Sequence, residues 1–150
     1  MICTEKRLKL CTILLVLNLC FIWGNSLLPG EVSGAFSDWV KELIASIFSM
    51  GGPDAPGGGL LRKLAHFSEF AMLGLLLTWL FGMLQKKPIV AFGLGFLAAC
   101  MDETIQRFVP DRGPSFRDVL IDSSGVLTGM LLLLAGYTIL KHKKSEEKNP

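Results

Sequence analysis

Long apolar segments separated by short polar ones dominate the chain. Four of them, at about 8–28, 64–84, 88–108 and 119–140, are long and apolar enough to form helices that cross a bilayer. The hydrocarbon core of a bilayer takes roughly 20 helical residues. The pattern therefore predicts an all-α, polytopic membrane protein with four transmembrane helices.

A shorter helix is predicted between the first and second of these segments. Over residues 35–48, apolar side chains recur at i, i+3, i+4 and i+7, with Asp38, Lys41 and Glu42 on the opposite face. This amphipathic segment is too short and too charged to span, so we expect it to lie in the outer membrane interface. The Gly- and Pro-rich residues 51–59 predict a flexible connector after it.

Composition supports the membrane assignment and excludes some partners. The chain has 150 residues, of which 51% are hydrophobic and only 19% charged, against about a quarter charged in a soluble domain. The length predicts one domain, 1–150. The net charge of +2, without a basic and aromatic stripe, argues against a nucleic-acid partner. The four cysteines lack the spacing of a disulfide framework or zinc knuckle.

The loop charges predict an orientation. In a four-helix topology, nine of the fifteen Lys and Arg residues fall on the side that holds both termini and the QKKP turn between the second and third helices. Basic residues concentrate on the cytoplasmic side of membrane proteins. Both termini are therefore predicted to be cytoplasmic, with residues 141–150 forming a disordered tail.

Polar residues interrupt the apolar segments mainly at their outer ends. The QKKP turn is short enough to make the second and third helices antiparallel neighbours, which places Glu69 and Asp102 at the same depth, a few ångströms below the outer surface. Asp102 and Gln106 share one helix face, and Glu103 and Arg107 are expected to form a surface pair.

Three further features concern helix packing. Asn25 and Ser26, near the outer end of the first helix, are expected to form hydrogen bonds to neighbouring helices. Gly125 and Gly129 are spaced as small residues are at close helix contacts in membranes. The sequence VPDRGPS before residue 116 predicts a tight reversal between the third and fourth helices.

The polar residues are predicted to converge at the outer mouth of one bundle. Carboxylates in lipid-like surroundings are costly unless they are paired, protonated or metal-bound. Two interpretations stay open: Lys63, Arg112 and Arg117 neutralise the acids and lock the helix ends, or the residues form a functional pocket at the outer leaflet. The candidate site residues are Lys63, His66, Glu69, Asp102, Glu103, Gln106, Arg112, Asp118 and Asp122.

Three motifs within this set resemble the VanZ-like family. They are K-x-x-H-F-x-E-F at 63–70, D-E-x-x-Q-x-F-x-P-x-R at 102–112, and D-V-L-x-D-x-x-G-x-x-x-G at 118–129. Two positions depart from the usual pattern, because Asp111 stands where Gly is common and Asp122 where Asn is common.

The resemblance implies a bacterial plasma-membrane protein similar to one that lowers susceptibility to teicoplanin, a lipid-bearing glycopeptide. The implied partners are membrane lipids and a lipid-linked cell-wall intermediate or a lipoglycopeptide. On this first hypothesis the protein is not an enzyme, and its polar mouth binds an amphiphile. A fold or family does not by itself determine function.

The alternative is a membrane-embedded hydrolase or transferase that acts on a lipid-linked substrate. His66 with Glu69, Asp102 and Asp118 offers an imidazole and hard oxygens for a divalent metal such as Mg²⁺, Mn²⁺ or Zn²⁺. His66 alternatively serves as a general base. No HExxH or GxSxG motif is present, so no catalytic residue is assigned. A transporter is less favoured, because polar groups at one end make no continuous path.

Overall fold

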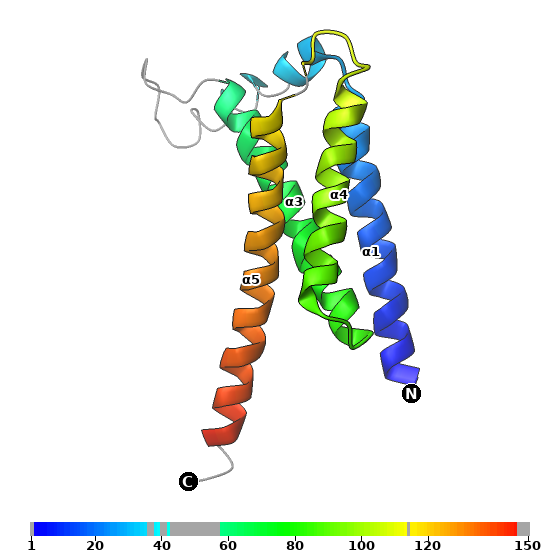
Figure 1. Ribbon diagram of the computed structural model, residues 1–150, viewed down its shortest axis with the longest axis vertical. Helices are drawn as coiled ribbons and strands as arrows, with labels where there is room; N and C mark the ends of the chain where they lie inside the picture. Colours follow the sequence, from blue (N-terminus) through cyan, green and yellow to red (C-terminus); the bar gives the residue numbers. More distant parts are fainter. Residues whose placement is uncertain (1, 36–37, 40–41, 43–57, 114, 147–150) are drawn as a thin grey trace.

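The computed structural model describes residues 2–35, 38–39, 42, 58–113 and 115–146. The long helices are α1 (Ile2–Ser26), α3 (Gly58–Met83), α4 (Pro88–Gln106) and α5 (Phe116–Glu146). Figure 1 shows them as one bundle, and the described residues contain no strand. The predicted all-α class is confirmed.

The four helices are long and apolar enough to cross a membrane. The protein is therefore a multi-pass membrane protein. An even number of crossings leaves both ends of the chain on one side, and Figure 1 shows both termini at the same end of the bundle. The candidate spans are Glu5–Ser26, Leu60–Met83, Pro88–Gln106 and Phe116–Lys143.

Two helices extend beyond their apolar segments. In the first turns of α1, Glu5 and Lys9 form an ion pair of 2.8 Å across one turn, an arrangement that supports a helix. Helix α5 continues to Glu146, so the prediction of a disordered tail from residue 141 is wrong for residues 141–146. Lys and Glu are good helix formers, and no Gly or Pro follows before Pro150.

Most of the predicted interfacial helix, 35–48, lies outside the described residues. The described segment after α1 is helical over 30–35. Residues 51–57 of the predicted connector are also outside the described part, whereas Gly58 and Gly59 already belong to α3.

The predicted tight turn between α3 and α4 is confirmed. Lys86 N donates a hydrogen bond of 2.8 Å to the carbonyl oxygen of Phe81, and Gln85 has a positive φ of 54°. Lys87 is extended, as a residue before proline prefers, and Pro88 starts α4. The turn makes α3 and α4 antiparallel neighbours that contact one another.

Helices α3 and α5 run parallel and cross closely. Gly125 lies against the carbonyl oxygen of Phe67, and Gly129 lies against that of Ala71, so each glycine brings the two backbones together. Gly74 of α3 belongs to the same contact. Small residues at helix contacts permit this approach, which matters in lipid because van der Waals packing holds the helices together. The predicted close packing at Gly125 and Gly129 is confirmed.

The parallel crossing determines which helix ends meet. The first turns of α3 and α5 lie at the same end of the bundle as the last turns of α1 and α4 (Figure 1). The helices pack around a hydrophobic core, and its buried members are Ile22, Phe70, Leu73, Leu77, Ala91, Ala98, Ala99, Val119 and Val126.

The turn between α4 and α5 contacts the chain that follows α1. Gly30 N donates a hydrogen bond of 3.2 Å to the carbonyl oxygen of Pro110, and a Cβ at Gly30 would overlap the backbone of Asp111. Asp111 has a φ of 58°, which glycine adopts without strain and aspartate tolerates better than most residues. Glycine would relieve the strain of this conformation.

We predict that Gly129→Leu destabilises the bundle and that Gly136→Leu does not. A side chain at 129 must displace the α3 backbone, whereas a Cβ at Gly136 of the same helix meets nothing within 4 Å. Overpacking of this kind costs about 1–3 kcal/mol. Thermal unfolding in detergent should show a lower melting temperature for Gly129→Leu alone, and equal temperatures for the two variants would contradict the close crossing.

Candidate functional site

Polar side chains gather where α3 and α5 begin and α1 and α4 end. The nine candidate residues predicted from the sequence all lie at this end of the bundle, on α3, α4 and α5 or in the turn before α5. Most of the polar side chains are buried or half-buried. We call the following set the polar cluster: Ser26, His66, Glu69, Asp102, Glu103, Gln106, Asp118 and Asp122.

Three cationic side chains border the polar cluster. Arg62 and Lys63 come from the start of α3, and Arg112 comes from the turn before α5. All three are half-buried. We call these three residues the cationic rim.

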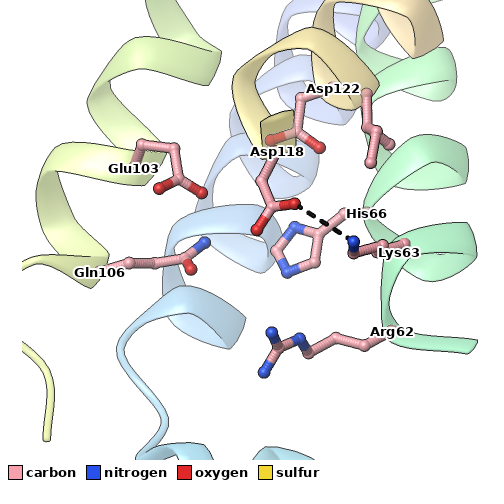
Figure 2. A pocket seen from close by; sticks show the side chains of 8 residues that line it. Arg62, Lys63, His66, Glu103, Gln106, Asp118 and Asp122 are labelled. Atoms are coloured by element: carbon pink, nitrogen blue, oxygen red, sulfur yellow. Dashed lines mark ion pairs between the residues drawn. The ribbon is translucent and has the colours of Figure 1, made fainter. Parts of the chain in front are cut away.

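A small cavity opens between these groups. Its volume is about 10 Å³, roughly the room that one water molecule or one ion needs. Figure 2 shows that α3, α4 and α5 each direct side chains toward it. The cavity is lined by Arg62, Lys63, His66, Glu103, Gln106, Asp118, Ile121 and Asp122.

His66 lies between two carboxylates without a hydrogen bond to either. Its Nδ1 atom is 3.9 Å from Asp102 Oδ2 and 4.0 Å from Glu69 Oε2. Both distances exceed the usual limit of a hydrogen bond, and Nδ1 has no other hydrogen-bond partner in the described part of the chain. His66 Nδ1 is therefore available to exchange a proton or to bind a metal ion or another ligand.

Asp102 is fully buried and is held by the same helix that carries it. Gln106 Nε2 donates a hydrogen bond of 2.8 Å to Asp102 Oδ2, which confirms that these two residues share a face of α4. The same Nε2 atom lies 3.3 Å from Ser26 Oγ on α1. Gln106 thus ties Asp102 to a second helix.

The end of α1 forms further bonds to the site. Asn25 Nδ2 donates a hydrogen bond of 3.1 Å to Glu69 Oε1, and Arg112 Nη2 donates one of 3.2 Å to the carbonyl oxygen of Asn25. The expected bonds of Asn25 and Ser26 to neighbouring helices are confirmed. Burial, and then the Arg62 guanidinium, lower the pKa of Arg112 from its ordinary value, but an arginine stays protonated in a protein.

The predicted surface pair between Glu103 and Arg107 is wrong. Glu103 is buried, and its Oε2 atom accepts a hydrogen bond of 2.8 Å from the backbone N–H of Ser115. Arg107 is exposed. The carboxylate therefore holds the turn before α5 in place, because the chain reverses over it after α4 ends.

Neutralisation accounts for only part of the polar cluster. Lys63 Nζ lies 4.0 Å from Asp118 Oδ1, the dashed line in Figure 2. Asp118 also lies in the first turn of α5, where the helix dipole favours a negative charge. No comparable partner reaches Asp122 within the described residues. Its side chain is 1% exposed, and neither carboxylate oxygen has a hydrogen bond.

The geometry selects a different set of metal ligands than the sequence alone indicated. His66, Asp102 and Asp122 each offer a ligand atom within 4.8 Å of the others, and all three side chains are buried. Of the predicted candidates, Glu69 and Asp118 lie outside this group, Glu69 bonded to Asn25 and Asp118 facing Lys63.

Two of the residues that line the cavity were not among the candidates from sequence. One is Arg62, at the start of α3. The other is Ile121, the apolar residue that lines the cavity. No sequence signal distinguishes Ile121 from the other apolar residues of α5.

We predict that Glu103→Ala destabilises the fold through the turn before α5. The substitution leaves the Ser115 N–H without its acceptor, and a buried unsatisfied donor costs about 1–3 kcal/mol. Glu103→Gln keeps an acceptor oxygen and should cost less. Exposed Glu31 provides the control as Glu31→Ala, and equal melting temperatures for both alanine variants would contradict a structural role for Glu103.

Comparison with known proteins agrees with the motifs. The model of the VanZ/LLP1 family matches residues 11–140, a range that reaches from α1 into α5 and includes the whole polar cluster. Neither a curated protein nor a solved structure gives a match. The family match covers most of the chain and agrees with the resemblance drawn from the three motifs, so the chain belongs to the VanZ/LLP1 family.

Proposed function

We propose that the protein handles the polar headgroup of a lipid-linked cell-envelope component at the outer leaflet of the bacterial plasma membrane. The observation that carries this proposal is the buried polar cluster at one end of four apolar helices. Ionisable groups inside a membrane segment are costly, and where they occur they usually mark a functional site. The cationic rim at the same end suits a phosphate-bearing headgroup, because Arg and Lys bind phosphate oxygens.

The distribution of charge supports an outward position for the site. The termini and the turn with Lys86 and Lys87 lie at the opposite end of the bundle from the polar cluster (Figure 1), and eight of the thirteen Lys and Arg residues that the structure describes belong to that opposite end. The positive-inside tendency supports a cytoplasmic placement for it. On this orientation, an amphiphile in the outer leaflet reaches the cluster by diffusing within the membrane.

Teicoplanin-type lipoglycopeptides fit the same proposal. Like a lipid-linked cell-wall intermediate, they carry a lipid that enters the membrane and polar groups that stay above it. A protein that binds either molecule at the outer leaflet would lower susceptibility to teicoplanin. Vancomycin lacks the lipid tail and serves as the matched comparison.

We predict a rise in the inhibitory concentration of teicoplanin, and none for vancomycin, when a susceptible Gram-positive host expresses the protein. The variant His66→Ala/Glu69→Gln/Asp102→Asn should abolish the rise. His142→Ala is the matched control, because His142 is the other histidine of the chain and is exposed near the end of α5, away from the site. Absence of a rise, with the protein shown to be in the membrane, would overturn the antibiotic part of the proposal.

A second candidate function is hydrolysis or group transfer on a lipid-linked substrate. The position of His66 beside Asp102, 3.9 Å away and next to a cavity, favours it. In hydrolysis of a phosphate ester, the oxygen of water bonds to phosphorus and the bond from phosphorus to the lipid oxygen breaks. His66 would take a proton from the water and give it to the departing oxygen.

The enzyme hypothesis predicts headgroup release from a polyprenyl-phosphate-linked probe by the purified protein in nanodiscs. His66→Gln should slow release by about 10²–10⁴-fold, the usual contribution of a general base, while His142→Gln leaves the rate unchanged. Binding of the probe without turnover would favour the first function over the second.

A further inference from the structure

We propose that His66, Asp102 and Asp122 bind one divalent transition-metal ion, with Zn²⁺ or Mn²⁺ as the best fits. The three ligands come from α3, α4 and α5, so the ion would join the three helices that line the cavity. Nothing in the function proposed above requires this ion.

The spacing of the ligand atoms is close to that of a metal site. The 3.9 Å between His66 Nδ1 and Asp102 Oδ2 is too long for a hydrogen bond. Two ligands of a tetrahedral zinc ion stand roughly 3.4 Å apart, given metal–ligand bonds of about 2.0–2.2 Å. Small side-chain movements therefore suffice to place an ion between His66 Nδ1 and the Asp102 carboxylate.

The buried atoms of the group lack other partners. Both oxygens of Asp122, Oδ1 of Asp102 and Nδ1 of His66 have no hydrogen bond among the described residues. The side chain of Asp122 is 1% exposed and that of Asp102 is 0% exposed. Burying a carboxylate without a partner costs several kcal/mol, so these groups need either a bound cation or protons.

The surrounding cations are insufficient to neutralise the acids. The polar cluster contains five carboxyl groups, and the cationic rim supplies three positive charges. With His66 neutral, the formal charge of the polar cluster and the cationic rim together is −2, which one divalent ion would balance. Lys63 faces Asp118 and Arg112 is bonded to the Asn25 carbonyl, so neither is placed on Asp122. The five carboxyl groups belong to Glu69, Asp102, Glu103, Asp118 and Asp122.

The neighbours of the group support coordination. Gln106 holds Asp102 through Oδ2 and leaves Oδ1 free, the kind of outer bond that orients a ligating carboxylate. One imidazole and two carboxylates suit Zn²⁺ and Mn²⁺ better than Ca²⁺, which takes oxygen ligands only. The cavity of about 10 Å³ beside His66 and Asp122 leaves room for a water molecule as a fourth ligand.

The ion would also explain how an acidic site accepts an anionic headgroup. Carboxylates repel phosphate, whereas a divalent ion attracts it. This consequence rests on the proposed function, but the binding of the ion does not.

The test is Zn²⁺ binding by the full-length protein in nanodiscs of neutral lipid, after chelation and dialysis and without added headgroup. We expect about one Zn²⁺ per chain by elemental analysis and a higher melting temperature when Zn²⁺ is added, because a ligand that binds only the folded state stabilises it. Co²⁺ in place of Zn²⁺ should show the visible absorption of a cobalt ion with a low coordination number.

The variants separate coordination from a general effect of acidity. Asp122→Asn preserves the side-chain volume and should lower Zn²⁺ affinity by more than roughly 100-fold, beyond the loss seen when an outer supporting residue is removed. His66→Ala should do the same. Glu31→Gln and His142→Ala alter an exposed carboxylate and an exposed histidine and should bind Zn²⁺ as the unmodified protein does.

Two results would overturn the cation site. One is less than about a tenth of an equivalent of Zn²⁺ in folded protein, which would mean that protons satisfy the buried carboxylates. The other is equal affinity in Asp122→Asn, shown to be folded by its melting curve. If Zn²⁺ binds but teicoplanin susceptibility does not change, the cation site stands and the antibiotic function fails. If Zn²⁺ does not bind but teicoplanin susceptibility falls, the cation site fails and the antibiotic function stands.

Discussion

The parallel crossing of α3 and α5 is the contact on which the arrangement of the polar cluster depends. Gly125 of α5 lies against the backbone of α3 at Phe67. Phe67 directly follows His66 in α3, and Gly125 lies about one turn after Asp122 in α5. This contact between the two backbones therefore brings the imidazole of His66 close to the carboxylate of Asp122. A larger residue at Gly125 would separate the helices where the site is built.

The antiparallel turn between α3 and α4 supplies the rest of the cluster. Because α4 returns from this turn to the end where α3 began, its last turns bring Asp102, Glu103 and Gln106 beside His66. Helix α1 completes the arrangement through Asn25, which donates to Glu69. Each helix thus contributes to the polar cluster from the turns that reach this end, and each also has a segment apolar enough to cross a membrane.

The two interpretations that the sequence left open apply to different residues. Asp118 faces Lys63, Glu103 accepts a backbone hydrogen bond and Arg112 binds the end of α1, so these groups stabilise the helix ends. His66, Asp102 and Asp122 have unpartnered atoms directed into one small region. A stabilising role does not explain these three, since a buried carboxylate without a partner destabilises a fold.

The sequence by itself determined the fold class, the four spans, the QKKP turn and the small-residue contact at Gly125 and Gly129. Hydrophobic length and turn chemistry are local properties, and they can be read without knowing what lies across the bundle. The sequence also predicted that nine polar residues gather at one end of the bundle, because polar groups stand out within apolar segments.

Only the tertiary structure decided how those nine residues pair. Glu103 bonds to the Ser115 backbone and not to Arg107. Asp122, not Asp118 or Glu69, completes the group of possible metal ligands with His66 and Asp102. Helix periodicity places a residue on a face, but the partner of that face depends on the crossing of two helices far apart in the sequence. Burial has the same origin, because a carboxylate loses its water only when a second and a third helix cover it.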